Sequence, residues 1–196
     1  MKVVLVGDTQ VGKTCILARL TSGTFRTNSP ATVGAAFQNH VMTTSKGAVT
    51  MQIWDTAGQE KYRALAPMYY RSAHVAILFF DLTNLDSFKS LDQWANELEE
   101  KTTGDLRLFL VGNKSDLVEE RKIKREDAEE FGFQHGAIEY IETSAKNGNG
   151  VVELFTKVAE VSESFATQDD ADQPAKAEIS SKQIGEQSGS SSGCNC

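Results

Sequence analysis

Short apolar runs alternate with segments of helical periodicity along most of the chain. Three of these runs, Lys2–Val6, Val75–Asp81 and Leu106–Gly112, consist mainly of large apolar residues, which is typical of strands in the middle of a sheet. A shorter run of the same kind follows at Glu139–Glu142. This alternation predicts an α/β fold in which helices cover both faces of a largely parallel sheet.

The other apolar positions predict helices and one antiparallel strand pair. Lys13–Ser22 is expected to form the first helix, and Ala36–Ser45 is expected to pair with Val49–Asp55 across a turn at Lys46-Gly47. Helical spacing recurs in two later sets, which are Phe88, Leu91, Trp94, Ala95 and Leu98, and then Val151, Leu154, Phe155, Val158 and Phe165. We therefore expect a six-stranded, mostly parallel sheet with one antiparallel strand and about five helices on its two faces.

The composition changes after about residue 165. Residues 166–193 are mainly Ser, Gly, Gln, Asp and Lys, and a segment with so few large apolar side chains cannot offset the entropy of ordering. We therefore predict one folded domain over residues 1–165 and a flexible tail over residues 166–196. The tail carries five acidic side chains against two lysines, so it lacks the polybasic character that binds anionic membranes.

Composition and charge narrow the class of protein further. A chain of 196 residues with 40% hydrophobic content suits one globular domain, and no apolar run approaches the roughly 18 residues of a membrane span. The formal net charge of −7 argues against a nucleic-acid partner. A strand follows Met1 at once, so no secretory leader is expected, and three cysteines fit no disulfide framework. His40, His74 and His135 are scattered, so we expect no histidine metal site.

One loop carries the strongest chemical signal. The segment Gly7–Thr14 matches the pattern G-x-x-x-x-G-K-[ST] and lies between the first predicted strand and helix. Its two glycines let successive N–H groups turn toward an anion, and the following helix adds the positive end of its dipole. Lys13 is expected to reach the β- and γ-phosphates of a nucleotide, while Thr14 ligates the Mg²⁺ that bridges them. The rest of the expected phosphate-binding set is Thr9, Gln10, Val11, Gly12 and Cys15.

A second motif, Asp55-Thr56-Ala57-Gly58-Gln59-Glu60, ends a predicted strand near that loop. Asp55 can hold the metal ion through a water molecule, and the N–H of Gly58 can bind a γ-phosphate. Gln59 can orient an attacking water molecule, because its amide both donates and accepts hydrogen bonds. Gln59 and Lys13 are therefore the expected catalytic residues.

Two further loops indicate a guanine base. Asn113-Lys114-Ser115-Asp116 closes a buried strand, and the carboxylate of Asp116 can accept from N1–H and the exocyclic amine of guanine, a donor pair that adenine lacks. Glu142-Thr143-Ser144-Ala145-Lys146 follows the next strand, with the N–H of Ala145 expected to be free for the guanine carbonyl. The expected base-binding residues in these loops are Asn113, Lys114, Asp116, Ser144, Ala145 and Lys146. The order and spacing of the four motifs favour a protein that binds GTP with Mg²⁺.

With these motifs in this order, residues 2 to about 165 resemble the Ras superfamily of small GTPases, and within it the Rab family. The strings Thr32–Phe37 (TVGAAF) and Leu65–Arg71 (LAPMYYR) are similar to those of its early-endosomal branch. The resemblance implies a P-loop G domain in which Thr32 joins the Mg²⁺ shell only with GTP, and in which Phe25 packs against guanine. It also implies a monomeric GDP/GTP switch in vesicle traffic that hydrolyses GTP slowly. Its implied partners are an exchange factor, a GTPase-activating protein, effectors and a GDP-dissociation inhibitor.

The resemblance also marks a surface and a departure. Phe37, Trp54 and Tyr69 are similar to the aromatic triad with which Rab proteins meet effectors. The alternative is plain packing on the strand pair for Phe37 and Trp54, and a hydroxyl that satisfies a neighbouring group for Tyr69. Thr9 and Gln10 stand where the family usually has smaller residues, and their bulk near the γ-phosphate leaves the intrinsic rate of hydrolysis open.

The last three residues, Cys194-Asn195-Cys196, resemble the doubly prenylated terminus of Rab proteins. A C-a-a-X signal would need cysteine where this chain has Gly193. One lipid chain gives only marginal membrane binding and the acidic tail adds no attraction, so we expect geranylgeranyl groups on both Cys194 and Cys196. The resemblance thus implies a protein that cycles between the cytosol and the cytoplasmic face of endosomal membranes, with the prenylation machinery as a further partner.

Two other classes of protein stay open from the sequence. A P-loop ATPase or nucleotide kinase shares the segment Gly7–Thr14, although it has no use for Asp116. A non-hydrolysing binding module, in which Thr9 and Gln10 have disabled turnover, keeps the same fold as a scaffold.

Overall fold

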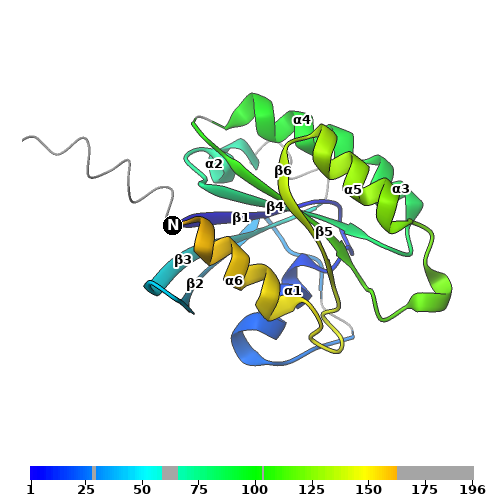
Figure 1. Cartoon of the computed structure of the whole chain (residues 1–196), viewed down its shortest axis with the longest axis horizontal. Coiled ribbons are helices and arrows are strands. Elements are labelled where there is room, and N and C mark those ends of the chain that lie inside the picture. Colours follow the sequence, from blue (N-terminus) through cyan, green and yellow to red (C-terminus); the bar gives the residue numbers. More distant parts are fainter. Residues whose placement is uncertain (28–29, 59–65, 103, 163–196) are drawn as a thin grey trace, which may run out of the picture.

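The computed structural model describes residues 1–27, 30–58, 66–102 and 104–162, which form a twisted sheet with helices on both faces (Figure 1). Within this part of the chain, six strands are hydrogen-bonded in the order β2-β3-β1-β4-β5-β6. Only β2 and β3 pair antiparallel there, while the other neighbours are parallel. The strands are β1 Lys2–Val6, β2 Ala35–Thr44, β3 Gly47–Thr56, β4 Val75–Asp81, β5 Arg107–Asn113 and β6 Ala137–Thr143. The expected fold class is confirmed.

The helices are divided between the two faces of the sheet. Figure 1 shows α1 and α6 on one side and α3, α4 and α5 on the other, in agreement with the two clusters of buried side chains. None of the described helices is both long and apolar enough to cross a membrane. The helices are α1 Lys13–Ser22, α2 Ala66–Tyr70, α3 Leu85–Lys89, α4 Leu91–Lys101, α5 Arg125–Gln134 and α6 Val151–Val161, with a 3₁₀ turn at Val118–Glu120.

The core follows from the two-residue period of the strands. In β4, Ile77 and Phe79 point to the face covered by α1 and α6, whereas Leu78 and Phe80 point to the opposite face. All four side chains are fully buried. Each burial of this kind stabilises the fold by roughly 1.5–3 kcal/mol, so the central strands hold the sheet rigid beneath the loops at its edge.

Two elements differ from the sequence expectations. The stretch with helical spacing between residues 88 and 98 is broken at Ser90, which lies between α3 and α4 and whose hydroxyl donates to Asp8 Oδ2 at 2.6 Å. Helix α5 was not predicted, because its apolar stripe is narrow and only Ala128, Phe131 and Gly132 are buried. Phe165, expected on the last helix, lies outside the described residues.

Candidate nucleotide-binding site

The loops that follow β1, β3, β5 and β6 meet at the carboxyl edge of the sheet and line a cavity of about 770 Å³. A cavity of this size suits a ligand as large as a nucleotide. Three predicted residues, Val11, Asp55 and Ser144, are buried behind its wall, and Gln59 lies outside the described residues. The predicted residues on the wall are Thr9, Gln10, Gly12, Lys13, Thr14, Cys15, Phe25, Thr32, Gly58, Asn113, Lys114, Asp116, Ala145 and Lys146.

The loop between β1 and α1 needs glycine at both of its ends. Gly7 has φ 131°, and a Cβ there would lie 2.3 Å from the carbonyl oxygen of Phe79. Gly12 has φ 99°, and a Cβ there would lie 2.2 Å from Asn113 Nδ2. A larger residue at Gly7 would push the loop away from β4, and one at Gly12 would push it away from Asn113. Asn113 belongs to the first of two base-side loops, which are residues 113–116 and 142–146. The glycines therefore set the shape of the cradle.

Lys13 is the buried cation of this loop. Its Nζ donates to the carbonyl oxygens of Gly7 at 2.6 Å and Asp8 at 2.8 Å, and the residue is only 6% exposed. Burial lowers the pKa of Lys13 to about 8, while the negative charges of Asp55 and Asp8 act in the opposite direction. An ammonium group that has lost most of its water in this way gains strongly from a bound anion.

The three residues expected to hold a metal ion lie together. The hydroxyl of Thr14 donates to Asp55 Oδ2 at 2.6 Å and lies 2.9 Å from the hydroxyl of Thr32. The other carboxylate oxygen, Asp55 Oδ1, is buried without a hydrogen-bond partner among the described residues. Burial raises the pKa of Asp55, and the hydrogen bond from Thr14 and the charge of Lys13 oppose this shift. Two hydroxyls and a carboxylate with an unsatisfied oxygen are a donor set that fits a hard divalent cation.

The base-side loops hold Asp116 from two directions. Ser144 Oγ donates to Asp116 Oδ1 at 2.5 Å, and Lys146 Nζ lies 3.7 Å from Asp116 Oδ2. Ser144 has no exposed surface, so it orients the carboxylate rather than lining the cavity. The expectation that the N–H of Ala145 is free was wrong: Asn113 Oδ1 lies 3.4 Å from this nitrogen, because the side-chain amide of Asn113 fills the space between the loops.

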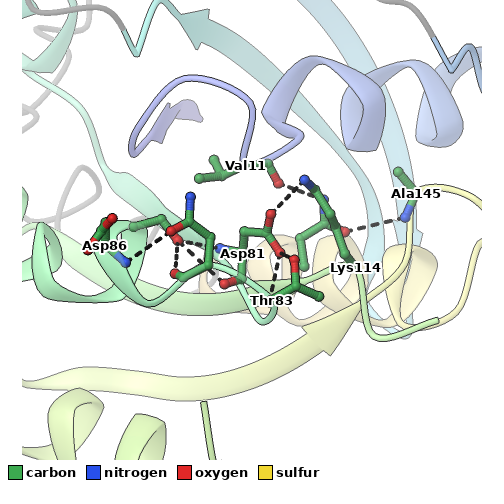
Figure 2. A network of polar contacts seen from close by, with 9 residues as sticks. Val11, Asp81, Thr83, Asp86, Lys114 and Ala145 are labelled. Atoms are coloured by element: carbon green, nitrogen blue, oxygen red, sulfur yellow. Dashed lines mark hydrogen bonds and ion pairs between the residues drawn. The ribbon is translucent and has the colours of Figure 1, made fainter. Parts of the chain in front are cut away.

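Asn113 connects the phosphate loop to the base-side loops, and Figure 2 shows two of its partners, Val11 and Ala145. Its Nδ2 donates to the carbonyl of Val11 at 2.8 Å, and its Oδ1 accepts from Thr143 Oγ1 at 3.2 Å in addition to Ala145. The side chain is 1% exposed, so these contacts are shielded from solvent. Asn113 therefore fixes the position of the phosphate loop relative to the base-side loops through buried hydrogen bonds.

Lys114 is held by a residue that no motif indicated. Its Nζ lies 2.6 Å from Asp81 Oδ2 at the end of β4, and Figure 2 shows Asp81 between Lys114 and Thr83. Asp81 Oδ1 accepts from both the N–H and the hydroxyl of Thr83, at 2.9 and 2.8 Å. Lys114 also has φ 67°, an uncommon backbone conformation that the ion pair helps to hold.

Arg121 joins the segment after Asp116 to the strand before the second base-side loop. Its Nη1 and Nη2 donate to the two oxygens of Glu142, at 2.9 and 2.5 Å, and the hydroxyl of Tyr140 donates to Glu142 Oε1 at 3.0 Å. The hydrogen bond from Arg121 lowers the pKa of Glu142, so the pair stays ionised. This bidentate pair fixes the distance between the two base-side loops.

Asp8 is a further site residue that no sequence motif indicated. Its carboxylate accepts from Trp94 Nε1 at 2.7 Å and from Ser90 Oγ at 2.6 Å, so it points away from the phosphate side and ties the loop to α4. A signal was present in the sequence: a carboxylate inside a phosphate-binding loop must turn away from the phosphates. Gly58 packs on the same loop, since a Cβ there would lie 2.3 Å from Thr9 N.

The three aromatic residues predicted to meet effectors form one cluster on β3, its partner strand and α2. The ring centroids of Phe37 and Trp54 are 5.0 Å apart, and those of Trp54 and Tyr69 are 5.5 Å apart. Phe37 is 49% exposed and the neighbouring Met68 is 72% exposed, so the cluster presents apolar surface. Lys2 Nζ lies 5.6 Å from the centroid of Trp54.

The cysteines divide between this cavity and the end of the chain. Cys15 is a free, partly buried thiol in the first turn of α1. Cys194, Cys196 and the predicted tail lie outside the described residues.

The phosphate loop, the cluster of cation ligands and the base-side loops together define a P-loop nucleotide-binding protein. The family description "Ras family" matches residues 2–164 of the chain. Rat Ras-related protein Rab-26 is 45% identical over 159 residues, which cover 81% of this chain and 62% of that protein. Mouse Ras-related protein Rab-19 is 41% identical over 158 residues, covering 81% of this chain and 73% of that protein. Ras-related protein RABF2b of Arabidopsis thaliana is also 41% identical over 158 residues, covering 81% and 78%. The chain therefore belongs to the Ras family and, within it, to the Rab proteins.

Proposed function

We propose that this protein is a molecular switch that binds GTP and GDP, hydrolyses GTP slowly and recruits effectors in vesicle traffic. The observation that best supports this function is the convergence of three sets of groups on one cavity. These are the phosphate cradle around Lys13, the cation ligands around Asp55, and the oriented carboxylate of Asp116. Membership in the Ras family supports the same assignment.

In the proposed complex, each set of groups has its own task. The ammonium of Lys13 and the N–H groups of residues 9–15 bind the phosphates. The carboxylate of Asp116, held by Ser144, accepts from the two guanine donors, and Phe25 packs against the base. A P-loop ATPase or kinase would not need this carboxylate, so its fixed orientation favours GTP over ATP.

The residues present also fit Mg²⁺. We infer that the hydroxyls of Thr14 and Thr32 and, through water, the carboxylate of Asp55 hold the ion, because Asp55 Oδ1 is otherwise a buried oxygen without a partner among the described residues. When bound, the ion neutralises negative charge on the phosphates. Thr32 precedes β2, so its position is coupled to the strand that carries Phe37.

The switch surface follows from these positions. Thr32 and Gly58 flank the strand pair that carries Phe37 and Trp54, and Tyr69 of α2 packs on Trp54 to complete the aromatic cluster. Contacts from a γ-phosphate to Thr32 and Gly58 would order this surface in the GTP form only, which is how an effector distinguishes the two states. We infer that an exchange factor, a GTPase-activating protein and a GDP-dissociation inhibitor act on the same region.

We further propose that lipids on Cys194 and Cys196 place this switch on the cytoplasmic face of intracellular membranes, with the endosome as its site. The acidic tail offers no electrostatic attraction to a membrane, so two lipid chains are needed for stable binding. The prenylation machinery is then a required partner.

Gln59→Leu is expected to slow GTP hydrolysis by at least about 10-fold while leaving GTP affinity unchanged, because it removes only the amide that orients water. Single-turnover phosphate release measures the rate, with and without a Rab GTPase-activating protein. Gln52→Leu, an exposed position in β3, is the matched control and should hydrolyse GTP at the wild-type rate. Wild-type hydrolysis by Gln59→Leu would refute the catalytic role. Absence of hydrolysis in the wild-type protein under both conditions would favour the binding-module alternative.

The same variant tests the membrane proposal. Trapped in the GTP form, Gln59→Leu should accumulate in the membrane fraction of cells that express it. Adding Cys194→Ser alone should release most of the protein, since one lipid chain binds a membrane only marginally, and the double Cys194→Ser, Cys196→Ser protein should be entirely cytosolic. Full membrane retention of the double variant would rule out lipid anchoring at these cysteines.

A further inference from the structure

Arg19 lies in the last turn of α1, and its guanidinium donates hydrogen bonds to three backbone carbonyls. Its Nε donates to Ala145 at 2.8 Å, its Nη2 to Lys146 at 2.6 Å and its Nη1 to Gly23 at 2.5 Å. Two of these bonds join residues more than a hundred positions apart in the chain. None of the four sequence motifs includes Arg19, and its side chain does not line the nucleotide cavity.

A cation at this position is partly explained by the helix itself. Arg19 lies in the last turn of α1, where a positive charge interacts favourably with the helix dipole, and its bond to Gly23 caps that end. The two bonds to Ala145 and Lys146 have no role in capping. They use the planar fork of the guanidinium, whose donors have a fixed geometry, to bind two successive peptide groups of the base-side loop while its third arm reaches Gly23.

The bonds to these carbonyls fix the opposite side of each peptide group. In a trans peptide the C=O and the N–H point in opposite directions, so holding the carbonyl of Lys146 also sets the direction of the N–H of Asn147. That N–H lies 3.3 Å from Ser144 Oγ, and Ser144 Oγ in turn donates to Asp116 Oδ1 at 2.5 Å. An unbroken series of contacts therefore runs from the guanidinium to the carboxylate proposed to read guanine.

We propose that Arg19 is a positioning residue for base recognition. It clamps the peptide groups after Ala145 and Lys146, and through Ser144 it holds the Asp116 carboxylate in the orientation that accepts from both guanine donors. Because α1 begins with Lys13 and Thr14, the same helix places the phosphate and cation groups at one end and this clamp at the other. The inference rests on the proposed function, since it concerns the base that the cavity binds.

The test compares GDP with IDP, whose base lacks the exocyclic amine of guanine. Affinities of both are measured by displacement of a fluorescent GDP analogue from the full chain in the presence of Mg²⁺. Arg19→Ala is expected to weaken GDP by about 10-fold and IDP much less, so that the preference for GDP over IDP falls several-fold. Arg19→Lys should give an intermediate preference, because an ammonium on a flexible stem keeps the positive charge but lacks the fixed donor geometry of the fork. Arg107→Ala, at the opposite end of β5, is the matched control and should keep the wild-type preference.

A double variant separates positioning from simple destabilisation. If Arg19 acts through Ser144, the preference for GDP over IDP should be the same in Ser144→Ala and in Arg19→Ala, Ser144→Ala. An equal loss of GDP and IDP affinity in both Arg19→Ala and Arg19→Lys, with the preference unchanged, would overturn the proposal. If Arg19→Ala does not fold, Arg19→Lys alone tests the proposal: a reduced preference for GDP over IDP supports it, and an unchanged preference overturns it. A wild-type protein without any preference for GDP over IDP and ADP would instead contradict the proposed function.

Discussion

Asp116→Asn should turn a protein that prefers GTP into one that prefers xanthosine triphosphate. The substitution replaces an acceptor by an amide, so the N1–H and amine of guanine lose a charged acceptor and face a donor, whereas the extra carbonyl of xanthine gains one. The substitution removes two hydrogen bonds to a charged group, so GTP affinity should fall by about 10²- to 10⁴-fold. The structure gives a reason for the size of the effect, because Ser144 and Lys146 hold this carboxylate and would hold the amide in its place.

The measurement is competition of GTP and xanthosine triphosphate for the cavity, with Mg²⁺ present. Asp105→Asn is a suitable control, since Asp105 pairs with Arg107 near the start of β5, at the edge of the sheet away from the cavity. GTP affinity that stayed at the wild-type value in Asp116→Asn would remove Asp116 from the base-binding set.

Lys13→Ala should reduce the affinity for GDP and GTP by about 10²- to 10³-fold, because it removes the one buried ammonium that the described part of the cavity wall contains. Without nucleotide, the free energy of unfolding is expected to change much less than the free energy of nucleotide binding. Burial of the ammonium has a desolvation cost, which is why the pKa of Lys13 is lowered to about 8, and this cost offsets its bonds to Gly7 and Asp8.

Two measurements are therefore made on the same Lys13→Ala preparation: nucleotide affinity and nucleotide-free thermal unfolding. Lys89→Ala, an exposed lysine at the end of α3, is the control for loss of a positive charge. A loss of unfolding free energy as large as the loss of binding free energy would mean that Lys13 acts mainly in folding and not in phosphate binding.

Much of the site could be predicted because its signals are local. The segment Gly7–Thr14 combines its glycines, its lysine and its hydroxyl in eight consecutive positions, and the strand and helix that flank it agree with the structure, down to the bounds Lys13–Ser22 of α1. The aromatic cluster was marked by resemblance alone. Phe37 and Trp54 lie close together because the antiparallel register of β2 and β3 places them opposite each other, and a correct strand pairing predicts this contact.

The residues that were missed bind partners far away in the chain. Asp8 contacts Ser90 and Trp94, and Arg19 contacts Ala145, so each contact exists only once the sheet order brings these loops together. No spacing rule along the sequence can indicate such pairs. The error at Ala145 has the same origin, because the position of the Asn113 side chain depends on both loops at once.

Thermal unfolding of the nucleotide-free full chain, with Mg²⁺ and a saturating amount of either GTP or ATP, tests the central claim most directly. A nucleotide at a concentration 1,000 times its dissociation constant stabilises the folded state by about 4 kcal/mol, a shift that unfolding curves resolve easily. We expect GTP to raise the unfolding temperature, a chelator of Mg²⁺ to reduce this rise, and ATP to have no effect. Equal stabilisation by ATP and GTP, or none by either, would contradict the assignment of this cavity to a guanine nucleotide.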